Sequence, residues 1–256
     1  MLKIMSIQSL DRAFMIIELF KHTDQGLTVK EIQELSCLPK GTIYRFLSEL
    51  EKYGYIQQDK RTKVYSLGLK LLELGMIVLE QIDIRKKAFP FLEKLRLYTN
   101  ENVNLAILDR NEVMYLERLE SAKILRLSVR IGSRVPIYCS STGKVILAFQ
   151  SESKIMDILN EVQFVPFTSR TISDKGQLTE ELKIIREKGY AISDRELFED
   201  VVTVAVPIFD HMGNVEIACN ISTPYFRFDK NHFESNFLPV LIETGKEISK
   251  AIGYRQ

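Results

Sequence analysis

The clearest pattern in the chain is a helical repeat of apolar residues within residues 38–50. Apolar side chains recur there at spacings of three and four, so they share one face of a helix. The residues on that face are Ile43, Phe46, Leu47 and Leu50. The opposite face carries small, hydroxyl and guanidinium groups, namely Gly41, Tyr44, Arg45 and Ser48, with Thr42 and Glu49 at its edges. This pattern is typical of a DNA-recognition helix and equally of an ordinary amphipathic surface helix, so the flanking segments have to decide.

Two shorter helices are predicted before this segment. Ser9 can cap the first one. Its apolar positions are Leu10, Ala13, Phe14, Ile17 and Phe20. Thr28 and Glu31 form a capping box for the second helix, because each side chain can bond the other residue's backbone amide. The second helix ends near Ser36, and residues 37–38 form a turn into the next helix, which is the arrangement of a helix-turn-helix.

A basic hairpin is predicted after these helices. Residues 53–56 and 64–67 are short β-type runs, and the polar turn between them carries Lys60, Arg61 and Lys63. A charge run in a turn is usually only solvated. Three helices followed by a basic hairpin nevertheless favour a winged helix that binds DNA.

The charge balance limits how the chain can bind a nucleic acid. Its 256 residues, 45% of them hydrophobic, suffice for two domains, and 35 basic side chains stand against 34 acidic ones. The whole chain is therefore no general binder of polyanions. Residues 40–66 hold six basic and three acidic side chains, an excess of three positive charges. Because that excess is modest, we expect a second copy of the domain to contribute to phosphate binding.

The three cysteines indicate a reducing compartment. Cys37, Cys139 and Cys219 are odd in number and widely separated, and they form no metal-ligand spacing with the three histidines. The N-terminus lacks the basic-then-apolar pattern of a signal peptide, and no apolar run reaches the roughly 18 residues of a membrane span. We therefore predict a cytoplasmic protein with no membrane partner, no metal and no cofactor.

An amphipathic helix is predicted to connect the two domains. Its apolar face comprises Leu69, Leu72, Gly75, Ile77, Val78 and Ile82. Such a helix can pair with its copy across a dimer or pack on its own chain, and the spacing alone does not decide. Residues 85–99 predict a further helix, which Pro90 would strain or kink.

The apolar period changes to that of strands from Asn102 onward. Strands are predicted at residues 103–108, 113–119, 124–129, 201–209 and 215–222. Helices are predicted at residues 142–149, 154–159, 178–187 and about 229–252. Strands flanked by helices without strict alternation predict an α+β domain with an antiparallel sheet.

Several segments resemble the IclR-type bacterial transcriptional regulators. Residues 7–13, 38–47 and 65–68 are similar to the winged-helix domain of that family. The segments similar to its effector domain are residues 132–144, residues 189–191 with Glu196, and residues 204–210. The resemblance implies a winged helix-turn-helix DNA-binding domain over residues 1–67, a linker or dimerisation helix over 68–84, and a GAF-like effector-binding domain over 85–256. It also favours a homodimer, or a dimer of dimers, acting on double-stranded operator DNA.

Two positions depart from the family pattern. Arg195 stands where the family commonly has a second Glu beside Glu196, and Asp200 stands where it usually has Gly. Both belong to a loop that borders the ligand pocket in the family, so they bear on which ligand binds. Residues 222–228 and 248–254 are most similar to the regulators that sense 2-keto-3-deoxygluconate.

The candidate effector site begins at Ser141, Thr142 and Gly143, where a helix is predicted to start. Free amides and the positive end of the helix dipole can bind a carboxylate there. The resemblance adds polar side chains and an apolar wall, which are Ser193, Thr203, Asn220, Ser222, Val135 and Leu127. Hydroxyl and amide groups suit a small organic acid with several hydroxyls, such as 2-keto-3-deoxygluconate. The same residues can equally be helix caps and sheet hydroxyls.

The predicted DNA contacts divide into two groups. Thr42, Tyr44, Arg45 and Ser48 project from the outward helix face and are predicted to contact base edges. Basic side chains at the helix start and in the hairpin are predicted to hold phosphates, namely Lys40, Lys60, Arg61 and Lys63.

Catalytic motifs are weak. Ser141 and Lys144 match an S-x-x-K motif, but neither S-D-N nor K-T-G follows it. Residues 142–144 resemble the end of a P-loop that lacks its first Gly and its final Ser or Thr. The sequence therefore predicts a transcriptional regulator and not an enzyme, with a small-molecule-processing enzyme carrying an accessory DNA-binding domain as the alternative. Repressor or activator, and dimer or tetramer, stay open.

Overall fold

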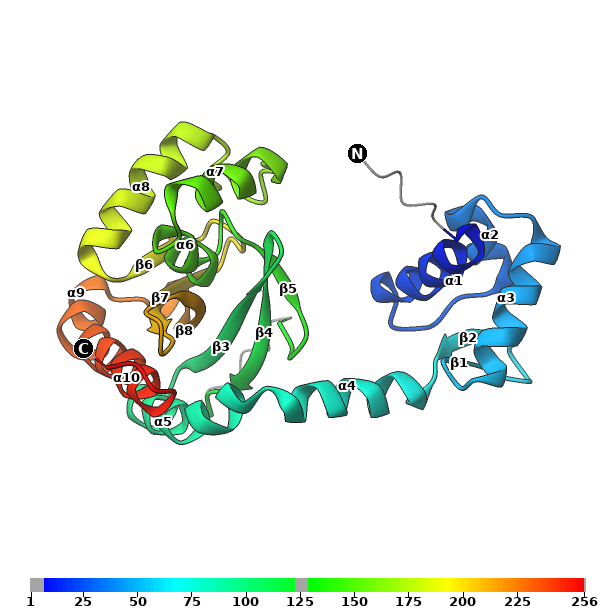
Figure 1. Cartoon of the computed structure of the whole chain (residues 1–256), viewed down its shortest axis with the longest axis horizontal. Helices are drawn as coiled ribbons and strands as arrows, with labels where there is room; N and C mark the ends of the chain where they lie inside the picture. The colour runs from blue at the N-terminus through cyan, green and yellow to red at the C-terminus, as the bar shows by residue number, and fades with distance from the viewer. Residues whose placement is uncertain (1–6, 123–128, 256) are drawn as a thin grey trace. The chain divides into compact units, whose positions relative to one another are not determined.

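Two compact units form the structure, which is a computed structural model that describes residues 7–122 and 129–255 (Figure 1). One unit comprises Met1–Gln81 and the other Ile82–Gln256. Each unit has its own hydrophobic core, as expected of chain segments that fold separately.

The N-terminal unit contains three helices, a two-stranded hairpin and a fourth helix. The helical elements are α1 (Gln8–Leu19), the 3-10 turn η1 (Phe20–His22), α2 (Val29–Ser36), α3 (Lys40–Lys52) and α4 (Leu69–Gln81). The strands β1 (Ile56–Gln58) and β2 (Tyr65–Leu67) pair antiparallel. Buried apolar side chains pack α1, α2 and α3 on the hairpin, chiefly Ile16, Ile32, Ile43, Leu47 and Ile56. The predicted winged helix-turn-helix is confirmed.

Local hydrogen bonds fix the second helix and the hairpin. The Glu31 amide donates to Thr28 Oγ1 at 3.3 Å and the Thr28 amide donates to Glu31 Oε2 at 2.7 Å, which is the predicted capping box. Leu27 and Tyr65 exchange backbone hydrogen bonds of 2.9 and 2.8 Å, which tie the hairpin to the start of α2. Gly26 allows this approach, because a Cβ atom there would lie 2.3 Å from the Tyr65 carbonyl oxygen.

The first helix differs from its prediction in two respects. It begins at Gln8 with no side-chain cap, and Ser9 lies inside its first turn. Ile16 is the fully buried residue of α1, whereas Leu10 and Phe14 of the predicted apolar stripe are more than half exposed. Leu10 and Phe14 are exposed because the core of this unit contacts α1 through Ile16 and Leu19.

The C-terminal unit is built on a six-stranded antiparallel sheet. Its strands are β3 (Asn102–Asp109), β4 (Glu112–Leu119), β5 (Arg134–Pro136), β6 (Ala191–Asp194), β7 (Val201–Phe209) and β8 (Val215–Pro224). The order in the sheet is β5-β4-β3-β8-β7-β6, and every neighbouring pair is antiparallel. The predicted α+β class with an antiparallel sheet is confirmed.

Helices cover both faces of this sheet. One face carries α6 (Ser141–Ala148), α7 (Glu152–Glu161) and α8 (Lys175–Lys188), and the other carries α5 (Asp83–Thr99) and α10 (Leu238–Ala251) (Figure 1). Ala205 of β7 faces the first group, while its neighbours Val204 and Val206 face the second. Because both faces are covered, the central strands are buried along almost their whole length.

The structure corrects one predicted helix of this unit and adds elements that were not predicted. The short strands β5 and β6 were not predicted, and the predicted strand at 124–129 lies almost entirely outside the described residues. The single helix predicted over 229–252 is divided into the short helix α9 (Lys230–His232), the π-helical segment η3 (Phe233–Phe237) and α10. A further 3-10 turn, η2 (Tyr225–Arg227), follows β8.

Candidate functional site

The outward face of α3 is a surface of polar and small residues. Ile43 and Leu47 are fully buried, while Gly41, Tyr44, Arg45 and Ser48 are exposed and Thr42 is half-buried. The Lys40 ammonium lies 5.9 Å from the centre of the Tyr44 ring, and the Arg45 guanidinium lies 5.8 Å from that of Phe46. These long side chains therefore lean along the helix. Neither Lys40 nor Arg45 forms an ion pair with any described residue.

The hairpin turn presents its basic residues to solvent. Lys60, Arg61 and Lys63 are all exposed. Asp59 shapes the turn, because its carboxylate accepts hydrogen bonds from the Thr62 and Arg61 amides at 2.9 and 2.8 Å. These bonds hold the pKa of the Asp59 carboxyl below its usual value. The Asp59 carboxylate therefore bonds backbone amides of the turn, and the basic side chains of the turn stay exposed to solvent.

A groove of about 470 Å³ runs between α3, the start of α2 and the hairpin. Lys40 and Lys63, both predicted phosphate ligands, line it together with Tyr44. The structure adds Lys30 to this wall, a residue that sequence reasoning missed. Lys30 lies on the exposed face of α2 and could be found only once the hairpin was placed against that helix. Three lysines around one groove form a surface suited to a phosphate backbone.

A polar cavity of about 30 Å³ lies inside the C-terminal unit. It has room for about one or two water molecules. Three predicted effector residues line it, Ser193 on β6, Thr203 on β7 and Ser222 on β8. These three strands are neighbours in the sheet, and the register pairs Thr203 with both Ser193 and Ser222. The remaining lining residues are Asn104, Tyr115, Arg118, Val129, Ser140, Leu197, Phe198 and Val201.

The predicted residues at the start of α6 lie behind this cavity wall and do not line it. Ser141 and Thr142 are fully buried, and Ser141 Oγ donates to Thr203 Oγ1 at 2.8 Å. Ser140 caps the helix, because its Oγ accepts a hydrogen bond from the Gly143 amide at 3.2 Å. Gly143 packs so closely on Ile137 that a Cβ atom would lie 2.3 Å from the Ile137 carbonyl oxygen. The helix start therefore has its own cap.

The other predicted effector residues differ in their positions. Asn220 accepts a hydrogen bond of 2.7 Å from Asn104 Nδ2, so it supports the cavity wall from the neighbouring strand. Val135 on β5 is buried in the core under α6. Leu127 lies outside the described residues.

Arg118 on β4 is the one charged residue among the cavity-lining residues that sequence reasoning missed, within the described parts of the chain. Its side chain is 5% exposed, and its Nη1 donates to Asn104 Oδ1 at 3.2 Å. The Nε atom lies 3.4 Å from the exposed Glu120 carboxylate, and Nη2 is buried without a hydrogen-bond partner among the described residues. A buried guanidinium with a free donor at a polar cavity is suited to bind a carboxylate. The sequence gives only a weak signal, an arginine that follows Glu117 near the end of a mostly apolar strand.

A buried ion network holds the loop next to this cavity. Lys144 on α6 is fully buried, and its Nζ lies 2.6 Å from both Glu196 Oε1 and Glu181 Oε1. Burial raises the pKa of Glu196 to about 7, although the neighbouring Lys144 lowers it. Glu196 immediately precedes Leu197 and Phe198, which line the cavity. The S-x-x-K lysine thus anchors the loop that covers the cavity.

The two positions that depart from the family pattern are not among the residues that line the cavity. The Arg195 guanidinium lies 3.5 Å from the centre of the Tyr225 ring and forms an ion pair of 2.9 Å with Asp194. Asp200 is exposed, and its carbonyl oxygen accepts a hydrogen bond from the Tyr225 amide at 2.7 Å. Arg195 and Asp200 therefore shape the ends of the loop and do not line the cavity.

The described residues contain no cluster of His, Cys, Asp or Glu that could hold a metal ion. Among these residues no helix combines the length and the apolar character needed to span a bilayer. A winged helix with a basic tip, joined in one chain to an α+β domain with a polar cavity, defines a DNA-binding regulator with a separate effector domain.

Comparison with known proteins identifies the family. Residues 9–60 match the IclR helix-turn-helix domain, and residues 76–250 match the family described as bacterial transcriptional regulator IclR C-terminal. The chain belongs to the IclR family of bacterial transcriptional regulators. This family consists of DNA-binding regulators, so the chain is a regulator and not an enzyme.

Relatives and solved structures cover nearly the whole chain. It is 36% identical over 248 residues to the HTH-type transcriptional regulator XynR of Escherichia coli K12, and this match covers 97% of this chain and 98% of XynR. It is 33% identical over 250 residues to KdgR of the same strain, with 97% and 94% covered. The crystal structure of Thermotoga maritima IclR superposes with a TM-score of 0.78 at 32% identity, covering 97% of this chain and 100% of that one.

Proposed function

We propose that the chain binds operator DNA as a homodimer or a dimer of dimers, and that a small organic acid bound in the C-terminal cavity changes its affinity for that DNA. The proposed domains are residues 1–67 for DNA binding, 68–84 for the linker helix and 85–256 for effector binding. Because its target is DNA, we expect the protein to act in the cytoplasm.

The exposed face of α3 supports a division of DNA contacts. Tyr44, Arg45 and Ser48, with Thr42 beside them, are free to reach base edges in a major groove, because the core holds only the opposite face. Phosphate contacts are assigned to Lys40, Lys60, Arg61 and Lys63, and Lys30 joins them on the shared groove.

Exposed apolar residues support a dimer. No residue of α4 is buried, and Leu69, Leu72, Met76, Ile77 and Val78 are between 44% and 77% exposed. Contiguous apolar surface of this kind marks an interaction site, and a second α4 supplies the matching surface. Two winged helices also provide the second set of phosphate contacts that the modest local charge requires.

The observation that carries the effector proposal is the free Nη2 atom of Arg118 at the polar cavity. We assign the effector carboxylate to Arg118, and its hydroxyl groups to Ser193, Thr203 and Ser222, which line the same cavity. The other described residues of the predicted site are then supporting positions around these contacts, namely Ser141, Thr142, Gly143, Asn220 and Val135.

The cavity volume implies that the effector opens the site. A space of about 30 Å³ does not hold a sugar acid, so Leu197 and Phe198 have to move when the ligand enters. The ligand favours the opened cavity, and the DNA site favours one arrangement of the wings. If these two states are coupled, each ligand changes the affinity for the other by the same factor. XynR and KdgR are 36% and 33% identical to the chain, so relatedness does not select an effector. The hydroxyl groups of the cavity suit a sugar acid, and we therefore choose 2-keto-3-deoxygluconate as the first acid to test.

The test is a titration of promoter fragments at several fixed salt concentrations, with and without 2-keto-3-deoxygluconate. A specific complex whose affinity changes with the acid supports both parts of the proposal. Specific binding that ignores this and related sugar acids rejects the effector assignment, and the absence of any specific complex rejects the DNA assignment. The sign of the change shows whether the acid releases or recruits the protein.

A further inference from the structure

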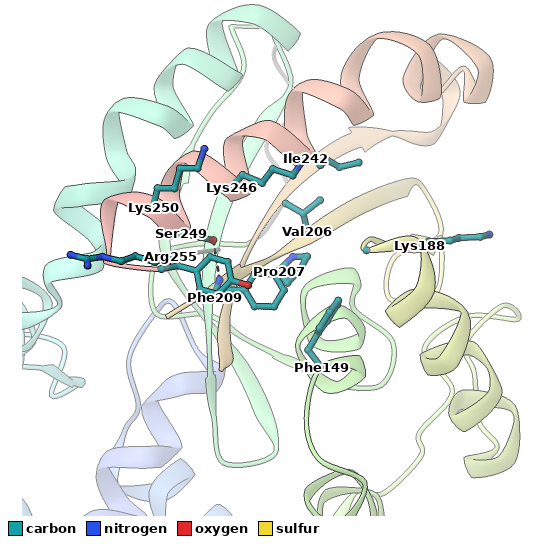
Figure 2. Close-up of a pocket in the computed structure, with 12 residues that line it drawn as sticks. Phe149, Lys188, Val206, Pro207, Phe209, Ile242, Lys246, Ser249, Lys250 and Arg255 are labelled. Atoms are coloured by element: carbon teal, nitrogen blue, oxygen red, sulfur yellow. Dashed lines mark hydrogen bonds between the residues drawn. The ribbon is translucent and has the colours of Figure 1, made fainter. Parts of the chain in front are cut away.

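A second, larger pocket lies at the other end of α6, away from the polar cavity. Ser140, just before α6, lines the cavity, whereas Phe149, just after it, lines a groove of about 470 Å³. The groove lies between α10, the end of α8 and the last residues of β7 (Figure 2). Its volume falls within the range of about 300–1,000 Å³ that is typical of small-molecule sites.

The groove exists because β6 is shorter than β7. Strand β6 pairs only with residues 202–205 of β7, so residues 206–209 have a strand neighbour on one side alone. An open strand edge could accept a peptide strand, but this one offers few donors. Pro207 has no N–H group, and the Phe209 amide already donates to Ser249 Oγ at 3.0 Å. The edge therefore does not favour addition of a strand.

The floor of the groove is apolar and aromatic. Phe209 stacks on Tyr254 with 5.1 Å between ring centres, and Phe149 meets Phe209 edge-on at 5.4 Å. Val206 and Ile242 complete this surface. The hydrogen bond from Phe209 to Ser249 joins β7 to α10 and holds the two walls in place. A hydrocarbon chain or ring that entered the groove would therefore be removed from water on a preformed surface.

The rim of the groove is positively charged. Lys246 and Lys250 rise from α10, Lys188 ends α8 and Arg255 follows the C-terminal turn (Figure 2). Among the described residues these four cations form no ion pair, and no Asp or Glu belongs to the lining. Four unpaired cations around an apolar floor are complementary to a molecule with one apolar end and one anionic end.

We propose that this groove is a second ligand site for an amphipathic organic anion, a molecule with a hydrocarbon or aromatic body and a carboxylate or similar head. The body lies on Phe149, Phe209 and Tyr254, and the anionic head lies between Lys246 and Lys250. The site is distinct from the polar cavity, because the two have no lining residue in common.

Three probes with one eight-carbon chain test this proposal on the full-length protein. Octanoate, 1-octanol and octylammonium share the apolar body and differ in the charge of the head. We expect calorimetric titration to rank their affinities in the order octanoate, octanol, octylammonium. Equal affinity for octanoate and octylammonium, or no binding of octanoate at millimolar concentration, would overturn the proposal.

Matched variants locate the bound probe. Lys250→Glu should weaken octanoate by about five- to tenfold, the factor expected from reversing one charge near the head. Lys86→Glu makes the same charge change at an exposed position on α5 that forms no ion pair with any described residue, and it should leave the affinity unchanged. Tyr254→Ala, beyond the last helix, should weaken octanoate and octanol alike because both lose the same apolar wall.

Two further outcomes would contradict the assignment. If Arg118→Ala abolishes octanoate binding while Lys250→Glu does not, octanoate occupies the polar cavity and the groove is not its site. If Lys250→Glu changes the sedimentation of the protein but not its affinity for octanoate, the groove contacts a second copy of the chain. Retained octanoate binding in Arg118→Ala, together with its loss in Lys250→Glu, supports the proposal.

Discussion

Lys144 Nζ and Glu196 Oε1 form an ion pair of 2.6 Å in the interior of the C-terminal unit. Lys144 is fully buried on α6, and Glu196 begins the loop whose next two residues line the polar cavity. The pair therefore joins the rigid helix under the site to the segment that covers it. Removing Lys144 would leave the buried Glu196 carboxylate without its cation and would cost about 3–5 kcal/mol, whereas without Glu196 the Lys144 ammonium would still pair with Glu181.

Stability of the C-terminal unit should depend on pH through Glu196. Burial raises its pKa from 4.5 to about 7 in the folded chain, so the folded state keeps a proton that the unfolded state releases. This contribution is fully present below about pH 4.5 and is lost as the pH rises through about 7. We expect urea unfolding to show that the free energy of unfolding of the wild type, relative to that of Glu196→Gln, falls by on the order of 3 kcal/mol across that window. Glu187→Gln, at an exposed position, is the control, and a difference independent of pH would reject the prediction.

Arg45 and Lys63 should affect DNA binding in different ways. Arg45→Ala should cost about 1–3 kcal/mol on the operator and little on random DNA, because Arg45 is assigned to a base edge. Lys63→Ala should weaken both DNAs alike and reduce the salt slope by about one, because a phosphate contact reads no sequence. Fluorescence anisotropy at four salt concentrations measures both quantities. Equal losses on both DNAs from Arg45→Ala would refute the division of contacts.

The winged helix was predictable because its signals are local. The period of Ile43 and Leu47, the capping box of Thr28 and Glu31, and the basic turn all lie within a few residues of the contacts that they make. The strands β5 and β6 escaped prediction because three or four residues are too few to show a period. The apolar stripe of α1 was wrong at Leu10 and Phe14, because the core of this unit does not cover these residues.

The effector cavity was only partly predictable because its walls depend on strand register. Ser193, Thr203 and Ser222 become neighbours through pairing of three strands, and family resemblance supplied these positions. Arg118 meets Asn104 across the pairing of β3 and β4, a contact that has no local signature. The amide expected to be free at Gly143 is occupied, because the cap falls on Ser140 in a run of two serines.

Arg118 should decide whether the protein responds to an organic acid. Arg118→Ala removes the free donor at the cavity, and we expect effector affinity to fall by about ten- to a hundredfold, the value of a hydrogen bond to a charged group. Arg118→Lys keeps the charge but loses the planar fork, so its loss should be intermediate. Calorimetry with the sugar acid that shifts DNA affinity measures this. Arg130→Ala, at an exposed site in the same unit, is the control and should bind the acid like the wild type. Unchanged affinity in Arg118→Ala would show that the carboxylate lies elsewhere.

The apolar surface of α4 should hold the dimer together. Ile77 is 47% exposed in the single chain, and it lies between Met76 and Val78, which are exposed as well. Ile77→Asp places a carboxylate in the proposed contact, where an unpaired polar group costs about 2–4 kcal/mol. Sedimentation equilibrium should show a dimer that dissociates at concentrations at least about thirtyfold higher, and operator affinity should fall with it.

The control for this dimer prediction is Glu80→Lys, at an exposed polar position of the same helix. It changes charge without touching the apolar residues, so dimerisation should remain within about twofold of the wild type, as expected for a surface substitution. A DNA titration of Glu80→Lys at low salt then separates dimer assembly from phosphate attraction. The added positive charge should strengthen binding to all DNA slightly and leave the oligomer unchanged. If Ile77→Asp left the oligomer intact, α4 would have to lie against its own chain, and the second set of phosphate contacts would need another interface.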